Sequence, residues 1–261
     1  MLKEQGAQVI VECQKELAGL LASCPGIDRL VAQGSPVPAF DVQAPLASLP
    51  GILHTSLATI PANVPYLFAD PGRIERWQHR LSGISGFKIG IAWQGNPAHP
   101  LDWVRSFPLA CFEPLAEIPG VCLISLQKGS GSDQLAAEAD RFAVTNLGPD
   151  LDESGAFVDT AAVMKNLDLV ITSDTAIAHL AGALGVPVWV ALRLVPDWRW
   201  LFDRQDSPWY PTMRLFRQTV RGNWPPVFES MADAVRGMLA ETKLQAEAER
   251  GRKPNKSKRA R

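Results

Sequence analysis

The feature of the sequence that most constrains its fold is a regular alternation of short apolar runs with segments of helical spacing after Gly86. Strand-like runs cover 87–93, 121–126, 144–147, 168–172, 186–192 and 213–217, and helical segments cover 109–117, 133–142, 157–166, 175–184 and 227–247. This alternation is typical of parallel strands, which need long crossover connections between them. We therefore predict an α/β, Rossmann-type domain with a doubly wound parallel sheet over residues 85–240.

The segment before this domain is less complete. Strand-like runs at 8–12, 27–32 and 40–43 are interleaved with helical segments at 14–22 and 71–81. The second of these helices has Asp70 as its expected N-cap and Pro71 at its first position. An independent nucleotide-binding half would begin with a strand, a glycine turn and a helix, and no such start is found here. We expect residues 1–84 to form a partial N-terminal α/β domain.

Composition and charge indicate an ordinary globular protein and argue against a nucleic-acid-binding one. Hydrophobic residues make up 46% of the chain and charged residues 20%, as in ordinary globular proteins. Residues 250–261 hold seven basic side chains and no acid, which leaves −8 on the rest of a chain whose total is −1. We expect a disordered basic tail over 241–261 and no nucleic-acid partner for the acidic body.

The cysteines and the apolar runs indicate the location of the protein and whether it holds a metal. The four cysteines have no metal-ligand or CxxC spacing, so they are expected to be reduced core residues of a cytoplasmic protein. No signal peptide opens the chain, and the apolar run 186–195 is too short to span a bilayer. The sequence therefore predicts a soluble protein without an integral membrane segment, metal or cofactor.

The strongest candidate site lies where the strand 168–172 ends and the helix 175–184 begins. Ser173, Asp174 and Thr175 occupy this turn, and a helix start offers free N–H groups and a positive dipole to phosphate. Asp174 could equally be only the N-cap of the helix. His179 lies one helical turn after Thr175 on the same face, although a lone histidine on a helix is more often a packing residue.

Two further loops leave strand ends at the same edge of the predicted sheet. The polar loop 94–106 contains Gly95, Asn96 and Arg105, and the fork of donors on arginine matches phosphate oxygens. An exposed surface role for Arg105 is the alternative. Gln127 and Lys128 follow the strand 121–126 and could meet a base or ribose, or simply lie in a solvated loop. The Trp-rich stretches 196–200 and 206–210 could bind sugars, but a structural role is favoured.

The sequence contains no GxGxxG, Walker-type, GxSxG or HExxH motif. Its most specific run is DLVITSDTAIAHLAGALGVPVWV at 168–190. Shorter runs are GIAWQGNP at 90–97, RSFPL at 105–109, SLQK at 125–128 and PDWRWLFDRQDSPWY at 196–210. In these runs the sequence resembles glycosyltransferase family 9, the heptosyltransferase-like group, in the form found in bacterial tetratricopeptide-repeat glycosyltransferases.

The resemblance implies a GT-B fold, with two Rossmann-like domains and a nucleotide-diphosphate sugar held mainly by the second. It places Arg105 at the diphosphate and Gln127 and Lys128 near the nucleoside. It also places Gly95 and Asn96 near the sugar or acceptor, without a metal. The residues that it assigns to the donor sugar and phosphates are Ser173, Asp174, Thr175 and His179.

The expected activity is transfer of a sugar, hexosyl or heptosyl, to an unknown acceptor. Family members carry their candidate general base on a Gly-Leu-Gly-Asp-type loop, which this sequence lacks, so no catalytic residue is assigned. The alternative is a non-catalytic nucleotide-sugar-binding module or a truncated gene fragment. A sugar-nucleotide epimerase on the same fold is a third, weaker hypothesis.

Overall fold

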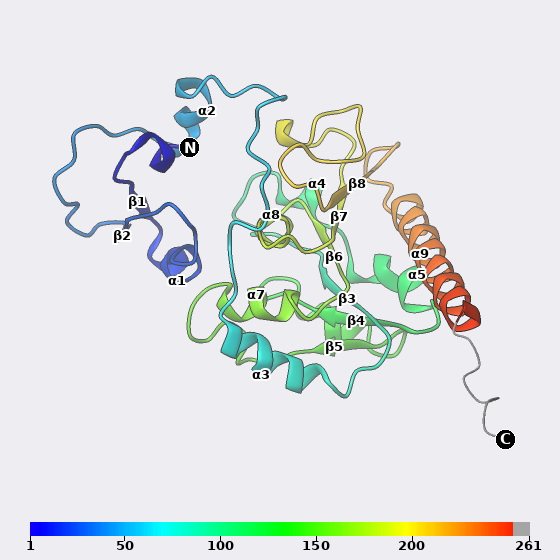
Figure 1. Cartoon of the computed structure of the whole chain (residues 1–261). Helices are drawn as coiled ribbons and strands as arrows, with labels where there is room; N and C mark the ends of the chain where they lie inside the picture. Colours follow the sequence, from blue (N-terminus) through cyan, green and yellow to red (C-terminus); the bar gives the residue numbers. More distant parts are fainter. Residues whose placement is uncertain (253–261) are drawn as a thin grey trace.

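A six-stranded parallel sheet forms the centre of the protein (Figure 1). The computed structural model describes the backbone of residues 1–252 and the side chains of residues 1–245. The strand order is β5-β4-β3-β6-β7-β8, which confirms the predicted α/β fold class. The strands are β3 (Phe87–Ala92), β4 (Val121–Ser125), β5 (Val144–Asn146), β6 (Leu169–Ser173), β7 (Val188–Leu192) and β8 (Met213–Arg217).

Both faces of the sheet are covered, which explains why its central strands are uninterrupted apolar runs. Successive residues of β6 point to opposite faces, so that Val170 joins one hydrophobic cluster while Leu169 and Ile171 join the other. The first cluster includes residues of α7 (Val158–Met164) and α8 (Ala176–Ala183). The second includes residues of η4 (Leu109–Phe112), α5 (Glu113–Ala116) and α9 (Pro225–Arg252).

Three predicted helices are shorter or more broken than expected, and the first of them, over 14–22, divides into a 3-10 helix at 15–17 and one α-helical turn at 18–21. The segment 109–117 divides into the 3-10 helix η4 and the short α5. The helix expected over 133–142 is limited to α6 (Gln134–Ala137), none of whose residues is buried. Within α6 the side chain that packs on the second hydrophobic cluster is the partly buried Leu135, and one such contact does little to hold a short segment helical. The loop 94–106 also contains one helical turn, α4 (Asp102–Arg105).

The first part of the chain forms a small separate layer. Strands β1 (Ile10–Cys13) and β2 (Arg29–Ala32) pair in parallel, and η2 (Lys15–Leu17) and α1 (Ala18–Leu21) connect them. The third strand expected over 40–43 is wrong: these residues have no strand partner, and Phe40 and Val42 are exposed. The remaining short helices are η1 (Lys3–Gln5), η3 (Leu46–Ser48) and α2 (Leu49–Ile52).

Helix α3 (Pro71–Leu81) lies beside α7, against the helical layer of the large sheet (Figure 1). Its N-cap is as predicted, because the Asp70 carboxylate accepts a 2.9 Å hydrogen bond from the Arg73 amide. Trp77 and Leu81 are buried in the same hydrophobic cluster as α7 and α8. Residues before α3 are held there as well, since the Leu67 amide donates to a carbonyl of α8.

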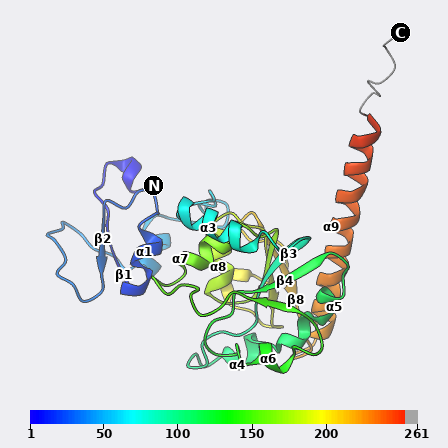
Figure 2. The ribbon, with the colours of Figure 1, turned by 90° about the horizontal axis from the view of Figure 1, so that it is seen from below.

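The chain closes with α9, which runs along the sheet and then projects away from the body (Figure 2). The helix reaches Arg252, so residues 241–252 of the expected tail are helical. The rest of that tail, 253–261, lies outside the described residues. No helix in the described part of the chain is both long and apolar enough to cross a membrane.

Candidate functional site

A cavity of about 430 Å³ opens at the carboxyl edge of the large sheet. Its walls come from the segments that follow β3, β4 and β5 and from the start of α8. Ligands of open α/β sheets bind at this edge, so the cavity lies where the fold predicts a site. The lining includes Gly95, Asn96, Arg105, Gln127, Lys128, Asp152, Phe157, Thr160, Thr175 and Ala176.

The N-terminus of α8 offers free hydrogen-bond donors to this cavity. Thr175 is the N-cap residue, and no side chain caps the helix. The amides of Ala176 and Ile177 have no acceptor among the described residues. Unsatisfied first-turn amides attract anions, and the helix dipole adds to this attraction. Asp174 therefore does not act as the N-cap that we considered as its alternative role.

Arg105 is held firmly at one wall of the cavity and is not a free surface arginine. Its side chain is 19% exposed, and its Nε donates to Oδ1 of the buried Asp102 at 3.1 Å. Its Nη1 donates to the backbone carbonyl of Asp174 at 2.9 Å. These bonds fix the guanidinium beside the start of α8, which brings two predicted site segments together.

Gly95 makes this arrangement possible. A Cβ at this position would lie 2.2 Å from Oδ1 of Asp102 and 2.7 Å from Nη2 of Arg105. Any larger residue would therefore displace the ion pair. The Gly95 amide donates to the Ser106 hydroxyl at 3.0 Å, which closes the loop on itself. The predicted loop residues Gly95 and Asn96 thus line the cavity together with Arg105.

Gln127 organises the loops around the cavity. Its Oε1 accepts from the amides of Trp93 and Gln94, and its Nε2 donates to the carbonyls of Gln94 and Ser130. These four bonds use the whole hydrogen-bonding capacity of a glutamine side chain. Lys128 is exposed and donates from Nζ to the carbonyl of Leu151, in the loop between β5 and α7. Its ammonium is the more available group for a ligand.

Ser173 and His179 do not line the cavity. Ser173 is fully buried, and its hydroxyl has no partner within the described structure. His179 stacks on Trp200 with ring centroids 5.2 Å apart, and its Nδ1 lies 3.1 Å from the Tyr210 hydroxyl. Burial lowers the pKa of His179, while the charge of Asp174 opposes this shift. The contacts of His179 are those of a packing residue.

The loop between β5 and α7, together with the first turn of α7, contributes three residues that the sequence patterns did not indicate. Asp152, Phe157 and Thr160 all line the cavity. The Asp152 carboxylate accepts from the amides of Asp159 and Thr160 at 2.7 and 2.8 Å and from the Thr160 hydroxyl at 2.5 Å. Asp152 and Phe157 have φ values of 59° and 65°, a region that L-residues occupy at a cost. An acidic, glycine-containing run before a predicted helix was the available signal.

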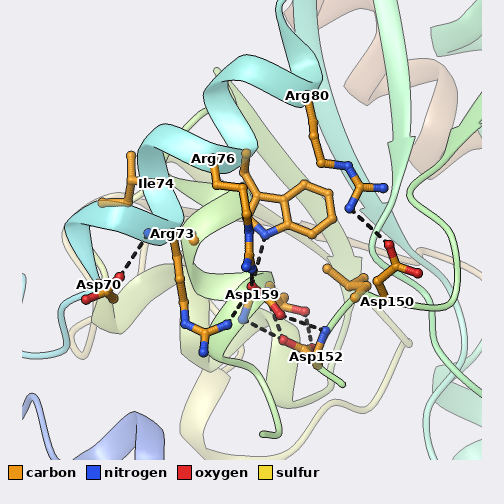
Figure 3. A network of polar contacts seen from close by, with 12 residues as sticks. Asp70, Arg73, Ile74, Arg76, Arg80, Asp150, Asp152 and Asp159 are labelled. Atoms are coloured by element: carbon orange, nitrogen blue, oxygen red, sulfur yellow. Dashed lines mark hydrogen bonds and ion pairs between the residues drawn. The ribbon is translucent and has the colours of Figure 1, made fainter. Parts of the chain in front are cut away.

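A buried carboxylate ties this loop to helix α3 (Figure 3). Asp159 is 2% exposed and accepts from Arg73 at 2.9 Å, from Trp77 Nε1 at 3.1 Å and from Arg76. It also accepts from the Asp152 amide at 3.2 Å. Burial alone would raise the pKa of Asp159, but the bonds from Trp77 and the two arginines outweigh it and lower that pKa. The wall of the cavity is therefore anchored to α3.

Comparison with solved structures identifies the fold. The fold resembles that of ADP-heptose lipopolysaccharide heptosyltransferase II of E. coli, with a TM-score of 0.62 and 14% identity over 91% of each chain. A family 9 glycosyl transferase of Veillonella parvula matches with a TM-score of 0.60 and 14% identity, over 90% of this chain and 89% of that one. The protein has a GT-B glycosyltransferase fold.

The sequence comparison matches part of the chain to one family. The model for "Glycosyltransferase family 9 (heptosyltransferase)" matches residues 120–192, which contain β4 to β7 and α8. The match over these residues confirms the resemblance noted from the sequence. Protein FlbA of Caulobacter vibrioides is 29% identical over 204 residues, which are 77% of this chain and 34% of that protein. The chain spans about a third of the length of this relative.

Proposed function

We propose that the protein binds a nucleotide-diphosphate sugar in the cavity at the carboxyl edge of the large sheet and transfers the sugar to an acceptor. The observation that carries this proposal is the meeting of three groups at one cavity. These are the free amides at the start of α8, the anchored guanidinium of Arg105 and the ammonium of Lys128. All three are donors or cations, and a diphosphate is the ligand that satisfies them together.

The same groups suit the chemistry of sugar transfer. When the glycosidic bond to the diphosphate breaks, negative charge grows on the leaving oxygen. Amides and cations already aimed at that position stabilise the charge without rearranging, and they do so without a metal. In this proposal Gly95 and Asn96 face the sugar or acceptor, Thr175 contacts the phosphates, and residues 1–84 form the acceptor side. The residues that lie behind the lining and do not contact the ligand are Ser173, Asp174 and His179.

A second candidate, a binding module without turnover, is favoured by one observation. Asp152 is the carboxylate that lines the cavity within the described structure, and three hydrogen bonds already engage it. A general base needs an acceptor site that is free to take the proton of the incoming hydroxyl. Among the described residues, none combines a position in the cavity with a free carboxylate or imidazole.

Calorimetry and a turnover assay test the two candidates. ADP, UDP and GDP are titrated against the full chain, with the matching monophosphates as controls. We expect at least one diphosphate to bind ten times more tightly than its monophosphate, because the second phosphate reaches the α8 amides. ADP-heptose is the first donor to assay, since the E. coli relative is named for it. Diphosphate binding without donor hydrolysis or transfer supports the module, and no nucleotide binding at all overturns both candidates.

A further inference from the structure

The loop between β5 and α7 forms a wall of the donor cavity whose backbone needs support from other parts of the chain. Asp152 and Phe157 both line the cavity, and their φ values of 59° and 65° lie in the left-handed region. This conformation is unusual for a bulky residue such as Phe157 and persists only where surrounding contacts hold it. The shape of the wall therefore depends on the residues that contact this loop.

Asp152 and Asp159 satisfy each other's backbone amides at the start of α7. The Asp152 carboxylate accepts from the amides of Asp159 and Thr160 at 2.7 and 2.8 Å. In return, the Asp159 carboxylate accepts from the Asp152 amide at 3.2 Å. This arrangement resembles a capping box, in which two side chains bond each other's amides at a helix start. It closes the segment 152–159 into a loop, so the place of Phe157 in the wall depends on Asp159.

Helix α3 supplies the positive charge that holds the Asp159 carboxylate (Figure 3). Arg73 donates to Oδ1 of Asp159 at 2.9 Å, and Trp77 donates to the same oxygen from Nε1 at 3.1 Å. Arg76 also donates to this oxygen. A carboxylate that is only 2% exposed has lost most of its water, and the two guanidinium groups replace that solvation. Asp159 thus joins the wall of the cavity to α3.

Further bonds connect α3 to both ends of the segment that carries the wall. Before the wall, Arg80 donates from Nη2 to the Leu147 carbonyl at 3.1 Å. At the far end of α7, Asn166 donates from Nδ2 to the Ile74 carbonyl of α3 at 3.1 Å. The segment 147–166 is therefore attached to one helix at its start, middle and end. No residue of α3 is among the described residues that line the cavity, so this helix acts from outside it.

The order of the strands indicates which part of the donor meets this wall. Between β6, which precedes the α8 amides, and β5, which precedes the wall, lie β3 and β4. Three strand spacings correspond to about 14 Å along the sheet edge. A diphosphate at the amides is too short to span this distance, whereas the attached nucleoside can reach the wall. Phe157 offers an aromatic ring on which a base can stack.

We propose that Asp159 is a positioning residue of the donor site, which keeps the loop 148–157 in the shape that receives the nucleoside. The inference rests on the proposed function, because the wall belongs to the same cavity. Arg73 and Arg76 act through Asp159, and none of the three contacts the nucleotide. Helix α3 lies within residues 1–84, the acceptor side of the proposed function. The acceptor side therefore also determines the affinity for the donor nucleotide.

Calorimetry on the full chain with two kinds of probe tests this role. ADP, UDP and GDP reach the wall, whereas inorganic pyrophosphate reaches only the α8 amides and Arg105. The variants are Asp159→Asn and the double variant Arg73→Gln, Arg76→Gln, which changes only partly exposed side chains and is the test if Asp159→Asn does not fold. We expect the dissociation constant of the preferred nucleoside diphosphate to rise at least fivefold in each variant. That of pyrophosphate should stay within twofold of the wild-type value.

Arg236→Gln is the matched control. Its guanidinium pairs with Asp233 within α9 at 2.8 Å, and its side chain is 51% exposed, as against 54% for Arg76. It should leave the affinity for every probe unchanged. Hydrogen exchange without ligand provides a second readout, in which amides of residues 148–160 should exchange at least ten times faster in the two test variants. The amides of β6 should exchange as in the wild type.

The outcomes separate this inference from the proposed function. Equal weakening of both kinds of probe would show a general loss of structure and overturn the positioning role. Unchanged affinity for the nucleoside diphosphates, or unchanged exchange over 148–160, in the folded variants would overturn it as well and leave the proposed function intact. Wild-type protein that binds none of the four probes would remove the proposed function, and this inference with it.

Discussion

The guanidinium of Arg105 donates a 2.9 Å hydrogen bond to the backbone carbonyl of Asp174, which lies 69 positions later in the chain. This bond places a fixed positive charge beside the uncapped start of α8. It also means that the Asp174 side chain and its carbonyl have different roles, because only the carbonyl contacts Arg105. Substitutions can separate these roles.

Arg105→Ala should weaken diphosphate binding tenfold or more, which corresponds to about 1.4 kcal/mol. Arg105→Lys should recover only part of this loss, because an ammonium lacks the fork that contacts two acceptors. Asp174→Ala should weaken binding less than Arg105→Ala, since the carbonyl remains. Calorimetry with the preferred diphosphate measures the order, and Arg29→Ala, at an exposed arginine of β2, is the control. Equal affinity of these four variants for the diphosphate would show that Arg105 does not contribute to binding.

Gly95→Ala should weaken diphosphate binding although Gly95 offers no side chain to a ligand. The new Cβ would meet Asp102 and Arg105 at distances that real contacts do not show, so the ion pair must move. We expect a loss of affinity in the same direction as that of Arg105→Ala. The control is Gly83→Ala, where a Cβ would have no heavy atom within 4 Å. If the two alanine variants bind the diphosphate equally well, the position of Arg105 does not matter for binding.

The architecture could be predicted from the sequence because local patterns determine it. The β8 bounds agree with the run 213–217, and Asp70 caps α3 as its position before Pro71 suggested. The strand expected over 40–43 does not form, because a strand depends on a partner as well as on its local pattern. Its apolar residues suit a strand, but a strand exists only when another strand pairs with it, and none does within the described chain.

The candidate site could be predicted only in part, because its contacts join distant segments. Arg105 and Thr175 were found through strand ends, which the sequence reveals. The saturation of Gln127 by four bonds depends on the meeting of the loops after β3 and β4, and the anchoring of Asp159 by Arg73 spans 86 positions. His179 has helical register with Thr175, yet Trp200 and Tyr210 determine its environment. The spacing of residues along the sequence does not reveal contacts between segments that lie this far apart in the chain.

Asp159→Asn should destabilise the protein by about 2–4 kcal/mol, since it removes a buried charge that several donors share. Asp150→Asn is the matched control. Asp150 also pairs with an arginine of α3, but at 3.4 Å and with a 63% exposed side chain, so its loss should cost less than about 0.5 kcal/mol. Urea unfolding at neutral pH measures both values. Equal destabilisation by the two variants would show that the Asp159 network contributes no more to the free energy of unfolding than an exposed ion pair does.

The buried state of His179 predicts how stability depends on pH. Because burial lowers the pKa of His179 in the folded protein, the unfolded chain takes up a proton first as the pH falls below about 6.5. Stability should therefore be fully present above that pH and decrease as the pH falls towards the lowered value. His179→Gln removes this titration, so its melting temperature should decline less than that of the wild type between pH 7 and pH 5. His99→Gln, in the exposed loop before α4, serves as control and should follow the wild-type curve. Parallel curves for the wild type and His179→Gln would mean that the imidazole is solvated, contrary to its stacking on Trp200.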